Sequence, residues 1–246
     1  MLNENLKIGK VDILAIAAHP DDAELGCSGT LIKSVAAGKR IGVCDMTAGE
    51  LGTRGSATLR LEEANKANDL LGSSFRVNLG MADGFFESNK ENKLKLVQII
   101  RACRPDVVLC NAISDRHPDH GRASDLQKVA CFLSGLQKID TQFNGEVQLA
   151  WRPKLVLHYI QDNFMIPHIV IDVTKHWDQK MNSIMAFSSQ FYNPNSNEPA
   201  SAISSKEFID LQEGRALQMG RYIGTRYGEG FISDRPLGIG QLTELI

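Results

Sequence analysis

The sequence predicts an α/β protein with a Rossmann-like, mostly parallel sheet and helices on both faces. In the first half of the chain, short apolar runs typical of strands alternate with amphipathic stretches typical of helices. This alternation indicates a parallel sheet that is covered on both sides. Helix-ending residues follow the helical stretches, at Gly38, Gly72 and Pro105, as expected at helix C-termini.

The first half of the chain is expected to alternate strictly between strand and helix. Pro118 marks the start of the last helix of this half, because proline is favoured in the first helical position. We predict strands at about 11–17, 40–46, 75–79 and 106–110, and helices at about 23–37, 58–71, 91–103 and 118–136.

The second half is less regular. A polar linker at 138–150 precedes two predicted strands, at 154–160 and 168–173, and a helix at about 175–188. A loop rich in Asn, Pro and Ser follows, and Ser204 with Glu207 resembles a capping box that opens a final helix. We see no repeat and no firm domain boundary, so the chain is expected to be a single domain.

Composition limits the classes of partner. The 246 residues carry a formal net charge of -2 and are 43% hydrophobic, so no overall field favours nucleic acid or an anionic membrane. The five cysteines are odd in number and lack CxxC spacing, as in a reducing compartment. No signal-peptide core or long apolar span is evident, and we therefore expect a cytoplasmic protein.

Two clusters of polar residues follow predicted strands. Ala18-His19-Pro20-Asp21-Asp22-Ala23-Glu24 comes directly after the first strand, and Asp115-Arg116-His117-Pro118-Asp119-His120 follows the strand that ends near Asn111. Ligands of open parallel sheets bind beyond the carboxyl ends of the strands, near a topological switch point. Neighbouring parallel strands would bring the two clusters together, although about a hundred residues separate them.

The combined residues match the ligands of a catalytic zinc site. Such a site has three protein ligands, from His and carboxylate groups, and an open position for water. We predict that His19, Asp22 and His120 hold one zinc ion per subunit, although another divalent metal is possible. Zinc lowers the pKa of its bound water to roughly 7.

Three further residues receive roles from their spacing. Asp21 need not point the same way as its neighbour in the sequence, and it could act as the general base on the metal-bound water. His117, at the start of the same helix as His120, could reach the oxygen or leaving nitrogen of a bound amide. Asp119 could orient one of the imidazoles by a hydrogen bond.

Each motif has a simpler structural interpretation. A lone HxxD is common, and HPDH could be a capped helix start with exposed histidines; only their joint placement favours a metal site. Glu24 is interpreted as a first-turn residue favoured by the helix dipole. His158, His168 and His176 stand singly in apolar or helical surroundings, and we interpret them as structural.

The motifs Ala18 to Glu24 and His117 to His120 resemble those of the PIG-L/LmbE-like family of zinc-dependent N-acetylglucosamine deacetylases. The similarity covers nearly the whole chain and favours the bacillithiol-biosynthesis branch. The segments that carry it are Cys44 to Gly55, Arg60-Leu61-Glu62-Glu63-Ala64, Asp115 to His120, Ser189-Gln190-Phe191 and Tyr227-Gly228-Glu229-Gly230-Phe231.

The resemblance implies a Rossmann-like fold and the same ligand set, with Asp21 as the base and His117 as the residue that stabilises the tetrahedral intermediate or protonates the amine. It also implies substrate contacts from Arg60 and, before the first C-terminal strand, from Arg152. A tyrosine of some relatives is replaced here by Phe208. Within the domain, 1–137 would form the core with the metal site, and 150–246 would complete the substrate pocket.

Two loop carboxylates, Glu50 and Asp83, should flank this site. Either could accept hydrogen bonds from sugar hydroxyls, although turn or capping roles are at least as plausible for each. Arg60 could equally be a solvated helix residue. An anionic aglycone would need a cationic partner, and Arg54, Arg60 and Arg152 are the candidates.

The expected reaction is therefore removal of the acetyl group from N-acetyl-α-D-glucosaminyl L-malate. The alternatives are a related deacetylase for a chitooligosaccharide or a glucosaminyl-inositol, and a sugar-binding or metal-binding module without turnover. A nucleotide-binding module is disfavoured because no GxGxxG follows the first strand. We also expect a small-molecule substrate, no nucleic-acid partner, no membrane partner, and a homo-oligomer that is a trimer or a hexamer.

Overall fold

A computed structural model of the chain describes residues 7–244. Its centre is a seven-stranded sheet with the order β3-β2-β1-β4-β7-β9-β8, and a separate two-stranded hairpin pairs β5 with β6. The strands are β1 Ile13–Ala17, β2 Ile41–Thr47, β3 Arg76–Met81, β4 Val107–Cys110, β5 Gln142–Phe143, β6 Glu146–Val147, β7 Leu155–Tyr159, β8 Ile169–Asp172 and β9 Gly228–Ser233.

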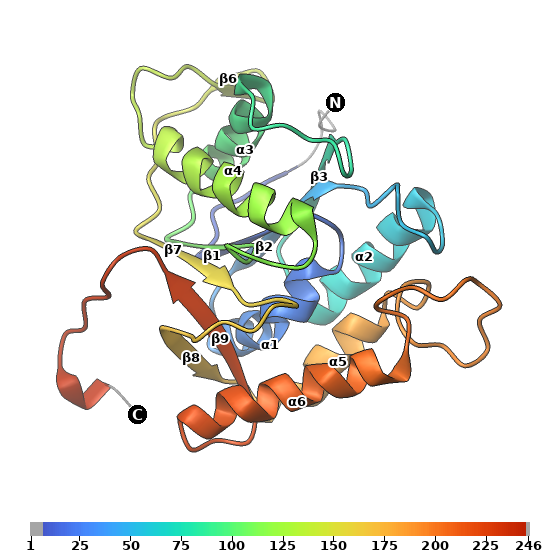
Figure 1. Cartoon of the computed structure of the whole chain (residues 1–246). Coiled ribbons are helices and arrows are strands. Elements are labelled where there is room, and N and C mark those ends of the chain that lie inside the picture. Colours follow the sequence, from blue (N-terminus) through green and yellow to red (C-terminus); the bar gives the residue numbers. More distant parts are fainter. Residues whose placement is uncertain (1–6, 245–246) are drawn as a thin grey trace.

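Helices cover both faces of the sheet, and α3 and α4 lie on the opposite face from α1, α2, α5 and α6 (Figure 1). The α-helices are α1 Asp22–Ala36, α2 Ala57–Leu71, α3 Lys90–Cys103, α4 Pro118–Ser134, α5 Trp177–Met185 and α6 Lys206–Tyr222. Short 3₁₀ turns, η1 Thr174–His176 and η2 Leu242–Glu244, complete the list.

The alternation of side chains along β1 explains the two layers. Leu14 and Ile16 belong to the apolar cluster that includes α3 and α4, whereas Ala15 and Ala17 belong to the cluster that includes α1. Successive side chains of a strand point to opposite faces, so β1 contributes to both cores. The predicted parallel sheet with two helical layers is confirmed.

The switch point of the topology lies between β1 and β4. These strands pair in parallel, with Ile13 opposite Val107 and Ala15 opposite Leu109. The chain runs outward from β1 to β2 and β3 in one direction and resumes at β4 on the other side. The loops that leave β1 and β4 therefore diverge to opposite faces and leave a crevice between them, which is where ligands bind in such sheets.

The C-terminal part differs from the prediction in three places. Strand β9 was missed, and it inserts between β7 and β8, antiparallel to both. The predicted linker at 138–150 contains the β5–β6 hairpin. The last helix is capped by Ser205, whose side chain accepts a hydrogen bond from Phe208 N, and not by Ser204, which instead bonds Ser201.

Two further predictions concern compartment. All five cysteines are buried and free, as expected from their number and spacing. Within residues 7–244, no helix combines the length and the apolar character that crossing a membrane requires.

Candidate active site

The loop after β1 turns sharply into α1. Asp21 is the residue before the helix, and it adopts a φ of 123°. Residues with a side chain rarely adopt this φ, because it costs free energy. Residues held in such strained conformations are found mainly at functional sites. His19, Asp21 and Asp22 are all nearly inaccessible to solvent.

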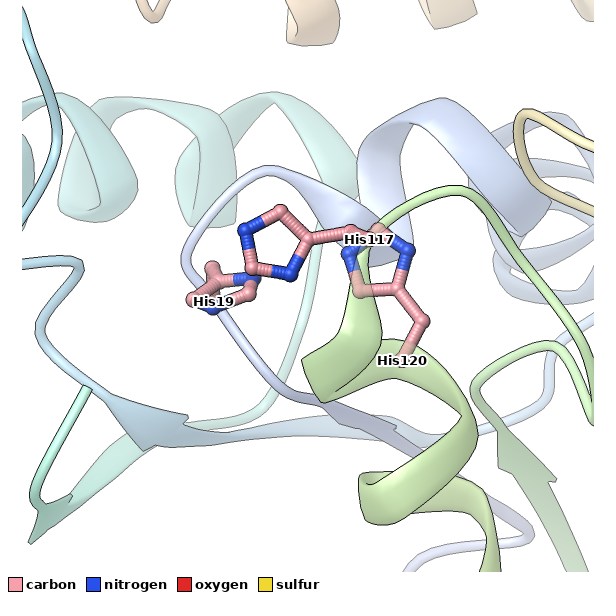
Figure 2. A group of neighbouring side chains, drawn as sticks. All are labelled: His19, His117 and His120. Atoms are coloured by element: carbon pink, nitrogen blue, oxygen red, sulfur yellow. The ribbon is translucent and has the colours of Figure 1, made fainter. Parts of the chain in front are cut away.

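The loop after β4 brings three imidazoles together. His117 caps α4, with its Nδ1 accepting a hydrogen bond from Asp119 N at 3.3 Å. The ring centroid of His117 lies 4.7 Å from that of His19 and 5.0 Å from that of His120. Figure 2 shows the rings of these histidines gathered between the loop after β1 and the start of α4. The predicted meeting of the two motifs is confirmed.

Asp22 connects the two motifs through its carboxylate. Its Oδ1 lies 3.0 Å from His120 Nε2, and its Oδ2 lies 3.5 Å from His19 Nδ1. Although burial by itself raises the pKa of Asp22, the two imidazoles outweigh burial and hold the pKa well below its usual value. Asp22 is therefore an anionic group aimed at both histidines.

The same carboxylates act on the histidines. Burial lowers the pKa of His120, but Asp22 and Asp115 outweigh burial and raise it to about 9. Burial also opposes the charging of His19, yet carboxylates, with Asp119 the strongest, hold its pKa well above the usual value. The site therefore favours positive charge between its imidazoles, which a divalent cation would supply.

The residues present fit a metal ion by their chemistry and spacing. Ligands bonded at about 2.0–2.1 Å in a tetrahedron lie roughly 3.3 Å apart, and Asp22 lies 3.0 Å from His120 through Oδ1 and 3.5 Å from His19 through Oδ2. Among the described residues, candidate atoms all lie within 4.8 Å of one another in the sets His19, His117, His120 and His19, Asp83, Asp119. Asp22 belongs to neither set, because it reaches its two imidazoles through different oxygens.

Asp21, which adjoins Asp22 in the sequence, pairs with Arg60. The Nη2 of Arg60 lies 2.5 Å from Asp21 Oδ2, and its Nε donates to Pro20 O at 3.0 Å. Burial raises the pKa of Asp21 to about 6, with Arg60 opposing the rise. Arg60 is buried and so is not the solvated helix residue of the alternative interpretation. Gly49 leaves room for the guanidinium of Arg60, because a Cβ at this position would lie only 2.5 Å from Arg60 Nη1.

The loop carboxylates Glu50 and Asp83 bind each other's loops. Glu50 accepts a hydrogen bond from Asp83 N at 2.8 Å, and Asp83 accepts one from Leu51 N at 2.9 Å. Asp83 also lies 3.1 Å from His19 Nε2, and Asp119 lies 3.2 Å from the same nitrogen. The structure therefore brings Asp83 and Asp119 into the site, while the contacts of Glu50 are with the loop backbone.

Arg152 is not brought to the site, and its expected substrate contact is wrong in position. It precedes β7 at the amino end of that strand, whereas the site lies at the carboxyl ends. Its guanidinium stacks over Phe132 and donates to Phe132 O at 2.9 Å. A residue at the amino end of a parallel strand lies at the opposite end of the sheet from a crevice beyond the carboxyl ends.

Glu24 lies in the first turn of α1, as predicted. It is buried there, in a cluster with Arg76 and Asp45 that we call the arginine cluster. The Nη1 of Arg76 lies 2.6 Å from Glu24 Oε1, and its Nε lies 2.7 Å from Asp45 Oδ2. An ion pair with Arg76 therefore holds this first-turn carboxylate, in addition to the helix dipole.

The three remaining histidines make the contacts of structural residues. His158 is buried against Ser124 and Asn111, His168 bonds Ser233, and His176 bonds Gln179. Their positions agree with the structural interpretation.

Sequence reasoning missed three residues that hydrogen-bond to the predicted ligands. Asp115 accepts from His120 Nδ1. Asn111 and Gln161 donate to the two oxygens of Asp22, each at 3.0 Å. Asn111 directly follows β4, and Gln161 lies two residues after the end of β7, the neighbouring strand. A polar residue at the carboxyl end of each predicted parallel strand was the signal that could have found them.

A pocket that His120 helps to line adjoins this site. Its polar lining includes Asp115, Gln161, Arg116 and Arg215. Both arginines pair with Asp162, Arg116 at 2.5 Å and Arg215 at 3.1 Å. Apolar lining comes from Ile160, just after β7, and from α6, which contributes Phe208.

Comparisons with known proteins agree with this geometry. The family model PIG-L, described as GlcNAc-PI de-N-acetylase, matches residues 14–131, which contain both motifs. The chain is 28% identical to the diacetylchitobiose deacetylase of Thermococcus kodakarensis, over 89% of this chain and 81% of the relative. It is 35% identical to the uncharacterized deacetylase YaiS of Escherichia coli, over 48% of this chain and 67% of the relative.

A solved structure extends the similarity to the C-terminal part. The conserved protein TT1542 of Thermus thermophilus matches with a TM-score of 0.83 and 34% identity, over 94% of this chain and 98% of that chain. The similarity in sequence and in structure therefore includes the metal-site motifs, the sheet and the elements after β7. The chain belongs to the PIG-L family of deacetylases.

Proposed function

We propose that this protein is a zinc-dependent hydrolase that removes the acetyl group from an N-acetylglucosaminyl substrate, with N-acetyl-α-D-glucosaminyl L-malate as the preferred one. The observation that carries the proposal is the meeting of His19, Asp22 and His120 beside Asp21 at the switch point of the sheet. Family membership and the diacetylchitobiose deacetylase among the relatives support the deacetylation of an N-acetylglucosaminyl substrate, while the preference for the malate glycoside rests on the resemblance of the sequence segments.

The cation is assigned to His19, Asp22 and His120. Zinc, when bound by imidazole and carboxylate ligands, makes hydroxide available near neutral pH and polarises a carbonyl oxygen. Asp115 and Asp119 accept hydrogen bonds from the ring nitrogens of His120 and His19. Such bonds fix the orientation of metal-binding imidazoles.

Asp21 acts as the general base. Burial raises the pKa of its carboxyl to about 6, near the operating pH, where a general base is most effective. The bond from Arg60 to one oxygen, Oδ2, holds the carboxylate in place. We infer that Asp21 takes the proton of the attacking water and that Arg60 aligns it, while Arg60 also faces the sugar.

His117 stabilises the oxyanion that forms when the acetamide carbonyl is attacked. Burial, together with His19 and His120, lowers its pKa, so its imidazole is neutral near pH 7. Because Nδ1 accepts a hydrogen bond from Asp119 N, the ring proton is assigned to Nε2, which can donate to the oxyanion. Collapse of the intermediate then releases acetate and the free amine, which takes up the proton held by Asp21.

The sugar is placed by Asp83 and Glu50, whose loops form one side of the site. For the malate, Arg116 replaces Arg152 as the cationic partner. The side chain of Arg116 is 50% exposed next to His117, and its pair with Asp162 leaves it in the pocket wall. An arginine suits a dicarboxylate because it donates in a fixed fork.

One assay tests the proposal. Acetate release is measured with the malate glycoside, with diacetylchitobiose and with free N-acetylglucosamine, on protein whose zinc content is determined. We expect the highest kcat/KM for the malate glycoside. A higher value for diacetylchitobiose would favour a chitooligosaccharide deacetylase, and sugar binding without acetate release from any of the three would favour a binding module.

Two finer predictions accompany the function. The five buried free thiols support a reducing compartment, and we propose the cytoplasm. A homo-oligomer, trimer or hexamer, is supported by large apolar side chains that stand exposed, such as Val147 and Leu149. Sedimentation at micromolar concentration measures that state directly.

A further inference from the structure

The imidazole of His19 faces carboxylates with both nitrogens. Its Nδ1 lies 3.5 Å from Asp22, within the proposed zinc site. Its Nε2 lies 3.1 Å from Asp83 Oδ1 and 3.2 Å from Asp119 Oδ2. One ring nitrogen carries at most one proton, so two carboxylates at Nε2 exceed what a single orienting hydrogen bond requires.

Both of these carboxylates are held in place by their surroundings. Asp83 Oδ2 accepts from Leu51 N, and Asp119 Oδ2 accepts from Gly84 N, each at 2.9 Å. Arg122 approaches the other oxygen of Asp119 at 3.1 Å. The exposed fraction is 7% for Asp83, 0% for Asp119 and 6% for His19. The three groups therefore form a buried, preorganised set of donors.

We propose that His19 Nε2, Asp83 and Asp119 form a second position for a divalent cation, across the His19 ring from Asp22. The candidate ligand atoms of the three residues lie within 4.8 Å of one another. One imidazole and two carboxylates are ligands that zinc and other first-row divalent ions accept. Two anionic side chains of this position would neutralise the ion.

The two positions exclude each other because they share one ring. A neutral imidazole has one nitrogen with a free lone pair, and the other carries the proton. With the proton on Nε2, His19 can bind a cation at Nδ1, beside Asp22 and His120. With the proton on Nδ1, it can bind one at Nε2, beside Asp83 and Asp119. The tautomer of His19 thus decides which position is filled.

This alternation has a consequence for activity. A cation at the second position is bound by Asp83 and Asp119 and leaves Asp22 and His120 without it. It also occupies the carboxylate that we assign to the sugar, so the protein in that form would neither bind substrate normally nor turn it over. The second position is therefore an alternative binding position for the same ion, and the protein is inactive when the ion occupies it.

A double-mutant cycle separates ligation by Asp83 from a merely orienting role. The affinity for Zn²⁺ is measured on the full chain by competition with a chelating dye, for wild type, Asp83→Asn, Asp22→Asn and the double variant. Asp22→Asn disables the first position and moves the ion to the second. We expect Asp83→Asn to weaken zinc binding less than tenfold in the wild-type background and at least a hundredfold in the Asp22→Asn background.

The opposite results would overturn the second position. If Asp83 only orients His19 and binds no cation, Asp83→Asn should weaken zinc binding by the same factor in both backgrounds. If the ion of Asp22→Asn is instead held by the three histidines, then adding His117→Ala would abolish its binding and adding Asp83→Asn would not. Either pattern leaves no place for a cation between Asp83 and Asp119.

Two controls keep the measurement interpretable. His120→Ala provides an independent background in which the first position is disabled, and the dependence on Asp83 should be the same there. Asp45→Asn removes a buried carboxylate of the arginine cluster and should leave zinc affinity unchanged. Absorption of Co²⁺ adds a readout independent of activity, because the spectrum of Asp22→Asn should change when Asp83 is replaced.

Discussion

Two clusters of buried charge lie close to the carboxyl ends of β1 and β2, and they differ in the partners of their carboxylates. In the arginine cluster, Glu24 and Asp45 face one guanidinium, which keeps its proton at all relevant pH. In the metal site, Asp22, Asp115 and Asp119 face imidazoles, which exchange protons near neutral pH and bind metal ions.

The difference teaches how to separate a structural cluster from a functional one. Burial alone does not do so, because Glu24 and Asp22 are both almost fully inaccessible. In the arginine cluster every carboxylate faces the same permanently charged group and no imidazole, and the cluster holds α1, β2 and β3 together. A titratable partner makes a cluster whose charge can be supplied by a proton or by a metal ion.

The largest effect is expected from Asp21→Asn. Asparagine keeps the shape of the side chain and tolerates positive φ, but it cannot accept the proton of the attacking water. We expect kcat to fall by roughly 10²–10⁴, with zinc content unchanged, as measured by acetate release and metal analysis. Near-normal turnover would show that Asp21 is not the base.

Asp45→Asn is the matched control, because Asp45 also pairs with an arginine but faces no imidazole. It should keep kcat and reduce the free energy of unfolding. Loss of turnover without loss of stability in this variant would remove the distinction between the two clusters.

The second effect is expected from Arg76→Met, which leaves two buried carboxylates without a partner. Breaking buried ion pairs in this way costs about 3–5 kcal/mol, which urea unfolding followed by circular dichroism would measure. Zinc affinity at the metal site should stay the same. A cost below about 1 kcal/mol, the value of a surface pair, would contradict a structural role.

The third effect is expected from Arg116→Ala. The KM for the malate glycoside should rise roughly tenfold, equivalent to about 1.4 kcal/mol of lost binding, because a charge-assisted contact is removed. The KM for free N-acetylglucosamine should not change. Equal changes for both substrates would assign Arg116 to the architecture of the loop after β4.

The smallest effect is a pH dependence of the metal-free protein. The pKa of His120 is raised to about 9 by Asp22 and Asp115 against the effect of burial. A raised pKa stabilises the fold fully below the unfolded pKa of about 6.5, and this contribution is lost as pH rises through 9. Chelator-treated wild type should lose a few degrees of Tm over that interval relative to His120→Gln.

Zinc supplies the comparison for this measurement. The ion requires His120 unprotonated, so the zinc-loaded protein should not show the same loss. A metal-free protein whose Tm rises over the same interval, relative to His120→Gln, would show that the carboxylates do not stabilise the charged ring.

The fold and the centre of the site could be predicted to different depths. The periodicity of the first half predicted β1 to β4 and α1 to α4, because local preferences and the tertiary fold agree there. Strand β9 was missed because Gly228 to Phe231 has two glycines and no long apolar run. Its pairing with β7 and β8 stabilises it, and such pairing is not a local property.

The chain order by itself determined which residues could meet. Parallel strands place their carboxyl ends at one edge, so the two histidine motifs had to approach each other once β1 and β4 were neighbours. The tertiary structure alone decided the partners: Arg60 for Asp21, Arg76 for Glu24, and Phe132 for Arg152. The sequence determines the charge and the length of a side chain, but the direction in which the side chain points depends on the residues that the fold packs around it.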